Sequence, residues 1–174
     1  MNEAADHRDP LYWRTIGPWW KRISIYDGGA LFLRQFAAAP EAVGHLFAAH
    51  WLQSEVRNGG FGQFFSNSTG VLAPEAERGF RAIGMPMAAD VIASQIASFG
   101  PAYPREQDDR ELVLEKRDRV VNRLIKTGNL IALAVRGRQM PPGDEAFWGL
   151  LKEENGGFLA AADRFALEND PDLA

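Results

Sequence analysis

Two of the three histidines lie close together in the chain, and metal binding is the first chemistry that they suggest. Glu41 and His45 are four residues apart, so a helix would place both side chains on one face, where they could share a metal ion. No residue nearby completes a ligand set, and the chain has no cysteine to supply a thiolate. His50 falls on an apolar face, and we expect a hydrogen-bonded, partly buried histidine there. The sequence therefore predicts no metal site and no cofactor.

Hydroxyl side chains gather at Ser66, Ser68 and Thr69, in a segment whose composition is typical of a loop. The Gly-x-Ser-x-Gly turn that exposes a serine nucleophile does not surround them. Gly60-Phe61-Gly62 lacks the third glycine of a dinucleotide-binding loop, and a predicted helix precedes it where that motif needs a strand. We therefore predict no catalytic residues and expect a protein that binds rather than an enzyme.

Apolar residues recur at helical spacing along most of the chain. One such stripe predicts a helix from Pro40 to Arg57 that ends at Asn58-Gly59-Gly60, since Asn and Gly readily adopt the backbone of a helix end. A second Asn-Gly-Gly-Phe begins at Asn155, and we interpret the two as similar helix breaks. Comparable patterns predict further helices over about 30–38, 74–83, 86–99 and 110–126, one after Asp144 and one from Phe158.

The helix predicted over 110–126 is highly charged, and its apolar residues are expected to face inward: Val113, Leu114, Val120, Val121, Leu124 and Ile125. The run from Leu130 to Val135 is short and continuously apolar, so periodicity does not separate helix from strand there. No segment is rich in strand patterns. The sequence therefore predicts the all-α class, with about seven or eight helices in a single domain over 1–174, of which residues 1–10 form a frayed terminus.

The composition favours a protein partner over nucleic acid. The 174 residues carry a net charge of -4, whereas a general nucleic-acid binder needs an excess of Lys and Arg. No apolar run is long enough to span a bilayer, and the first residues lack the pattern of a secretory signal, so we expect a cytoplasmic protein.

Negative charge is concentrated in the last part of the chain. Residues 141–174 contain eight acidic residues against Lys152 and Arg164, whereas residues 101–140 are net basic. A solvated helix face is the ordinary explanation of such a run. The functional hypothesis is an acidic surface that binds a partner, and its candidate residues are Asp144, Glu145, Glu153, Glu154, Asp163 and Glu168.

The segment around the first helix break carries a recognisable pattern, in which Glu55 precedes Asn58-Gly59-Gly60-Phe61 and is followed by Gln63, Phe64, Phe65 and Asn67, with a later helix that ends at Ile83-Gly84. This pattern resembles the DNA-mimic-protein-nineteen-like domain family of bacterial helical proteins. The resemblance implies an all-α fold and self-association, as in a homodimer. It also implies a role, because the founding member imitates DNA and occupies the DNA-binding face of a transcription factor.

Three hypotheses remain open from the sequence. The first is a non-catalytic module whose acidic surface binds a basic protein, such as a DNA-binding regulator. The second is an enzyme or small-ligand binder that uses the region from Glu55 to Asn67, although a helix end, a tight turn and buried phenylalanines account for that segment more simply. The third is an immunity-type partner of one other protein, recognised through an apolar patch at Trp13, Trp19 and Trp20.

Overall fold

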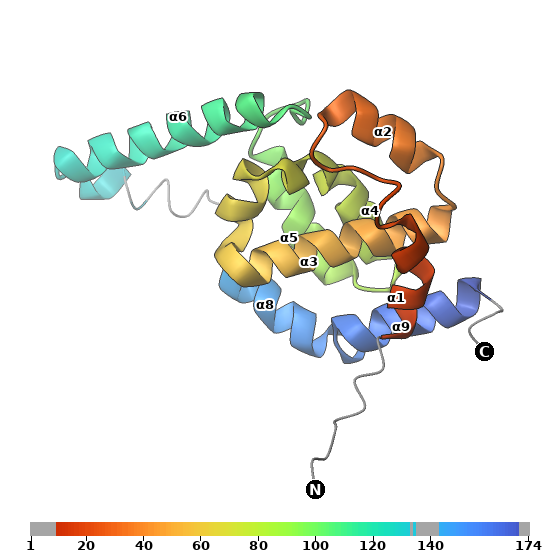
Figure 1. Ribbon diagram of the computed structural model, residues 1–174. Coiled ribbons are helices and arrows are strands. Elements are labelled where there is room, and N and C mark those ends of the chain that lie inside the picture. The colour runs from red at the N-terminus through yellow and green to blue at the C-terminus, as the bar shows by residue number, and fades with distance from the viewer. Residues whose placement is uncertain (1–9, 133, 135–142, 171–174) are drawn as a thin grey trace, which may run out of the picture.

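The computed structural model describes residues 10–132, 134 and 143–170, and these residues form helices and turns without a strand (Figure 1). The prediction of an all-α fold is confirmed. The predicted frayed terminus lies outside the described residues except for Pro10. The helices are α1 (Leu11–Ile16), α2 (Gly29–Ala37), α3 (Glu41–Ser66), α4 (Ala73–Ala82), α5 (Pro86–Ala97), α6 (Gln107–Lys126), α8 (Asp144–Glu153) and α9 (Phe158–Asn169), with 3-10 turns η1 (Gly17–Trp19), η2 (Ser68–Leu72) and η3 (Glu154–Gly156).

The long helix α3 forms the centre of the molecule. It contacts α1, α4, α6, α8 and α9, and α4 in turn packs on α5 (Figure 1). Its side chains Leu46, Leu52 and Phe64 are fully buried, as are Phe80 on α4 and Phe147 on α8. Burying each such side chain contributes roughly 1.5–3 kcal/mol, so a core of this size can hold short helices that would not be stable alone.

The break predicted at Asn58-Gly59-Gly60 is present, but the chain resumes a helix directly after it. Gly59 (φ -153°, ψ 16°) and Gly60 (φ 76°, ψ 177°) leave helical geometry, and the turns that follow run from Phe61 to Ser66. The φ of Gly60 lies in the region that glycine adopts without steric cost. The helix predicted to end near Arg57 is therefore the first half of a kinked helix.

The prediction that the apolar residues of α6 face inward is wrong for Val120 and Ile125, whereas Val121 and Leu124 are partly buried. Val113 and Leu114 pack against the core, but Val120 and Ile125 are 40% and 57% exposed. The second half of α6 extends away from the other helices (Figure 1). A periodic stripe shows that a helix has an apolar face, but it does not show that a neighbour covers that face.

The run that the sequence left undecided is helical where it is described, at residues 130–132 and 134, while Val135 lies outside the described residues. Leu130 and Ile131 are 73% and 81% exposed. In the part of the chain that the structure describes, we find no helix both long and apolar enough to cross a membrane.

Candidate functional site

The family motif surrounds the kink of α3 and holds its two halves together. Glu55 Oε2 accepts hydrogen bonds from Asn67 Nδ2 at 2.8 Å and from Gln63 Nε2 at 3.4 Å. Phe61, Phe64 and Phe65 are buried, whereas Asn58 and Gly59 are exposed. The side chains of Glu55 and Asn67 therefore bond to each other, and not to the backbone groups that the break exposes.

Residues far along the chain satisfy those backbone groups instead. Asp144 Oδ1 accepts a hydrogen bond from the N–H of Phe61 at 2.8 Å, which caps the second half of α3. Arg110 is fully buried and donates to the carbonyl oxygens of Phe65 (2.9 Å), Asn67 (2.7 Å) and Arg105 (2.6 Å). Burial lowers the pKa of the Arg110 guanidinium, and the three carbonyls offset part of that cost. Arg110 could not be recognised as a buried residue from the sequence, because it lies among many other charged residues.

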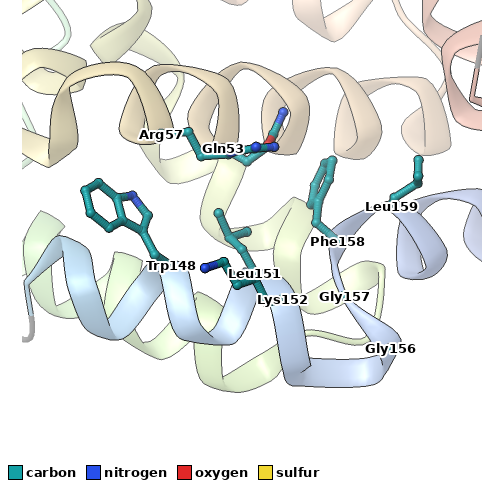
Figure 2. Close-up of a pocket in the computed structure, with 9 residues that line it drawn as sticks. All are labelled: Gln53, Arg57, Trp148, Leu151, Lys152, Gly156, Gly157, Phe158 and Leu159. Atoms are coloured by element: carbon teal, nitrogen blue, oxygen red, sulfur yellow. The ribbon is translucent and has the colours of Figure 1, made fainter.

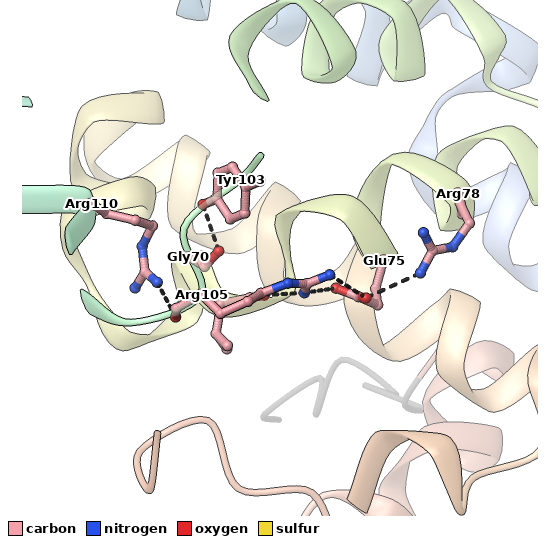
Figure 3. A network of polar contacts seen from close by, with 7 residues as sticks. Gly70, Glu75, Arg78, Tyr103, Arg105 and Arg110 are labelled. Atoms are coloured by element: carbon pink, nitrogen blue, oxygen red, sulfur yellow. Dashed lines mark hydrogen bonds and ion pairs between the residues drawn. The ribbon is translucent and has the colours of Figure 1, made fainter. Parts of the chain in front are cut away.

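A second buried polar group joins α4 to the segment before α6 (Figure 3). Arg105 reaches both oxygens of the Glu75 carboxylate, at 2.6 and 3.0 Å, and Arg78 approaches the same group at 3.1 Å. Tyr103 donates its hydroxyl proton to the carbonyl of Gly70 at 2.7 Å, and burial raises the pKa of this phenol. These bonds fix η2 and α4 against the segment before α6, so their role is structural.

The prediction of a hydrogen-bonded, partly buried His50 is confirmed. Its Nδ1 lies 2.9 Å from the hydroxyl of Tyr12, and the rings of Trp13 and Trp20 lie 4.9 and 5.5 Å from the imidazole, centroid to centroid. Burial lowers the pKa of His50 to about 4. Burial, with a smaller contribution from Asp163, raises the pKa of Tyr12 to about 12. Both groups are therefore neutral near pH 7.

The tryptophans proposed as an apolar patch pack against the same core. Trp13, Trp19 and Trp20 are each partly buried, and Trp20 stacks on Trp51 with a centroid distance of 4.6 Å. The guanidinium of Arg22 lies 5.2 Å from the ring of Trp19. Much of the surface of these rings is thus used within the molecule.

Glu41 and His45 do lie on one face of α3, with His45 Nε2 3.5 Å from Glu41 Oε1. Within residues 10–132, 134 and 143–170, no group of three His, Cys, Asp or Glu side chains is arranged to hold a metal ion.

The six acidic candidates divide into two sets. Asp144, Glu154 and Asp163 accept hydrogen bonds from backbone N–H groups at the first turns of other helices. Glu145, Glu153 and Glu168 are exposed, and they form no ion pair within the described part of the chain. The two sets are interspersed along α8, η3 and α9, and only the second set is free to contact a partner.

Four carboxylates line a cleft of about 550 Å³ beside α6. Glu111, Glu115 and Asp118 lie along one side of α6, and Asp144 joins them from the start of α8. Arg117 is the basic residue of this lining, and its guanidinium donates to the hydroxyl of Ser98 at 2.9 Å. Sequence reasoning missed this acidic cleft because it assigned 101–140 a net positive charge and did not separate the helix faces.

A second cavity, of about 450 Å³, lies between α3, α8 and the start of α9 (Figure 2). Gln53 and Arg57 line it from α3, and Lys152 lines it from α8. Its apolar walls are Trp148, Leu151, Phe158 and Leu159. This cavity thus combines two cations with aromatic and aliphatic surface, whereas the acidic cleft carries the opposite charge.

A family model described as DMP19-like protein matches residues 37–173, a range that contains the kink motif, the acidic cleft and the cavity. The chain belongs to the DMP19-like family. The DMP19-like match therefore covers the described helices from the end of α2 through α9.

The chain is also similar to an alanine–tRNA ligase of Chloroflexus aurantiacus, with 34% identity over 99 residues. The matched part is 51% of this chain and 11% of the ligase, so the chain spans a small fraction of that enzyme's length. No solved structure matches the chain.

Proposed function

We propose that this DMP19-like chain is a non-catalytic module that binds a basic surface on another protein, in the manner of a DNA mimic. The acidic cleft is the observation that carries the proposal. A carboxylate offers negatively charged oxygens to Arg and Lys as a phosphate does, so an acidic groove can occupy a surface that would otherwise bind DNA. A DNA-binding transcription regulator is the class of partner that such a surface fits.

The geometry of α6 supports this proposal. Glu111, Glu115 and Asp118 follow one another at spacings of four and three residues, which keeps them on one side of the helix. Asp144 lies across the cleft, and the neighbouring Glu145 is exposed. The acidic surface is thus formed by α6 and the start of α8 together.

The similarity to the ligase concerns a small part of that enzyme. The match to the ligase involves 11% of that protein, which is the kind of match expected when a small module is joined to a longer chain. The activity that the ligase's name describes is therefore not assigned to this chain.

The experiment is capture of proteins from native lysate on the immobilised chain at low and high salt. We expect one basic protein to be retained at low salt and lost at high salt, because screening weakens exposed ionic contacts. Replacing Glu111, Glu115 and Asp118 together by Lys should abolish its capture. The matched control reverses Glu153 and Glu168, which are exposed but lie away from the cleft; Glu154 is left intact because it caps α5.

Each result bears on the proposal. Capture that is equal at both salt concentrations contradicts the electrostatic mechanism. The role of the cleft is contradicted if the Glu153 and Glu168 variant loses capture while the α6 variant retains it. That result would place the binding surface near the end of the chain.

We also propose that two copies of the chain associate through the outer part of α6 and the residues that directly follow it. This segment, residues 119–132, is called the α6 arm below. Its residues Val120, Ile125, Leu130 and Ile131 are 40–81% exposed, which is costly for aliphatic side chains in water. A second copy would cover the same residues on both chains, as a two-fold dimer requires.

A further inference from the structure

The cavity between α3, α8 and α9 contains polar groups whose bonding capacity is unused. Gln53 is 8% exposed, and its side-chain amide has no hydrogen-bond partner among the described residues. The two polar atoms of this amide are not sealed from solvent, so the open cavity is the space in which they can find a partner. Gln53 lines the cavity, so a ligand there can restore the missing bonds (Figure 2).

Two cations face the same space. Arg57 comes from α3 and Lys152 from α8, and neither forms an ion pair within the described residues (Figure 2). Both side chains are exposed, so their charges are available to a ligand. The cavity therefore has an excess of positive charge that calls for an anion.

A comparison of the two copies of Asn-Gly-Gly-Phe indicates the chemical class of this anion. Gly60 (φ 76°, ψ 177°) and Gly157 (φ 90°, ψ 161°) have nearly the same backbone geometry, and each precedes a helix that begins at Phe. At the first copy, the Asp144 carboxylate accepts the N–H of Phe61 at 2.8 Å. At the second copy, α9 has no side-chain cap, and Gly156, Gly157 and Phe158 line the cavity.

The walls of the cavity define the rest of the ligand. Trp148, Leu151, Phe158 and Leu159 give apolar surface on two sides. The indole N–H of Trp148 donates to the carbonyl of Val56 at 3.2 Å, which fixes this wall against α3. Trp148 and Leu159 are 40% and 53% exposed, so their apolar surfaces are open to a ligand.

We propose that this cavity binds a small carboxylic acid with an apolar body. Its carboxylate occupies the place at the start of α9 that Asp144 occupies at Phe61, between Arg57 and Lys152, with Gln53 as a further donor. Its apolar body lies against Trp148 and Phe158. The volume of about 450 Å³ is within the range of small-molecule sites. This site shares no carboxylate with the acidic cleft, so it stands apart from the proposed partner surface.

The test is titration of the intact chain with 3-phenylpropionate, followed by NMR of backbone amides and indole N–H groups. We expect saturable shifts at Phe158, Leu159 and Trp148, with a Kd on the order of 1 mM or tighter. Arg57→Gln and Lys152→Gln should each weaken binding roughly tenfold, since each removes one charged contact. The matched control is Lys116→Gln, an exposed cation of α6 outside the cavity, which should leave the Kd unchanged.

Two further probes examine the chemical class. The neutral 3-phenylpropanamide has the same apolar body without the charge, and acetate has the charge without the body. We expect both to bind at least tenfold more weakly than 3-phenylpropionate. The proposal is overturned if the amide or acetate binds as tightly as the acid. It is equally overturned if folded Arg57→Gln and Lys152→Gln variants keep the original Kd, or if no saturable shift develops.

Discussion

At the scale of single residues, four carboxylates act as caps on helices that are distant in sequence. Asp163 accepts the N–H of Tyr12, Glu106 that of Gly29, and Glu154 those of Met87 and Ala88. With Asp144 at Phe61, the first turns of α1, α2, α5 and the second half of α3 each receive an acid from elsewhere. Such bonds satisfy free N–H groups and favour the helix dipole, with typical contributions of about 1 kcal/mol each. Part of the acidic C-terminal run therefore exists for stability.

His50 should make the stability of the fold depend on pH. Burial lowers its folded pKa from 6.5 to about 4, so the unfolded chain binds a proton first as the pH falls. The contribution is fully present above pH 6.5 and is lost as the pH falls from 6.5 towards 4. The predicted loss is on the order of 2–3 kcal/mol of unfolding free energy. Urea unfolding at several pH values measures it.

The control for this prediction is His50→Gln, which keeps an acceptor for the Tyr12 hydroxyl but does not titrate. Acidic residues titrate in the same window, so the informative quantity is the difference between the parent chain and the variant. That difference should narrow steadily between pH 6.5 and pH 4. A difference that stays constant with pH would show that His50 is protonated equally in both states.

At the scale of elements, the kink of α3 depends on Gly60. An alanine at this position would have to adopt a positive φ of 76°, which is strained for a residue with a side chain. Its Cβ would also collide with the Asp144 carboxylate that caps Phe61. Gly60→Ala should therefore lower the free energy of unfolding by about 2–3 kcal/mol, from backbone strain and loss of the cap. Chemical denaturation with circular dichroism measures the change.

Gly62 offers a matched control two residues further along the same helix. It is exposed, its φ is not positive, and a Cβ there would meet no atom within 4 Å. Gly62→Ala should leave stability unchanged or raise it by up to about 1 kcal/mol, because alanine favours a helix. Equal destabilisation by both substitutions would mean that the kink has no special requirement for glycine.

The helix boundaries show which parts of the fold could be predicted from the sequence. Glycine and proline mark helix ends through local backbone preferences, so α2, α4 and α5 begin within one residue of the predicted positions. The start of α6, at Gln107, lies three residues before the prediction, because no proline or glycine marks it. The roles of Asp144 and Arg110 were not predictable, since their partners lie 83 and 45 residues away and no spacing rule connects them.

The candidate site was predictable only in part, for the same reason. The break motif was found from local sequence, and its phenylalanines are buried as the structural interpretation expected, whereas Glu55 bonds to the side chain of Asn67. The cavity was not found, because Arg57 and Lys152 belong to helices that meet only after folding. Its second Asn-Gly-Gly-Phe was noticed, but sequence alone does not show that one copy has a carboxylate and the other lacks it.

At the scale of the whole molecule, opposite charges are separated on different surfaces. The cleft beside α6 gathers acids from two segments, while the cavity near α9 gathers cations from two others. Net charge by sequence segment assigned these signs almost in reverse, with a basic middle and an acidic end. The reversal arises because helix faces, rather than continuous segments, form a surface.

The α6 arm should be the least protected part of the described structure. Most of its side chains are exposed and its helix extends from the domain, so we expect its amides to open without disturbing the core (Figure 1). In dilute solution we expect residues 119–126 to exchange amide hydrogens at least about tenfold faster than residues 46–56 of α3.

If two copies associate through the arm, raising the protein concentration from about 1 µM to about 1 mM should slow amide exchange in the arm alone. Ile125→Glu should remove that dependence, whereas Met87→Glu, at a similarly exposed position on α5, should preserve it. Exchange in the arm that is fast and independent of concentration would contradict the proposed dimer, while fast exchange in α3 would contradict its place as the centre of the fold.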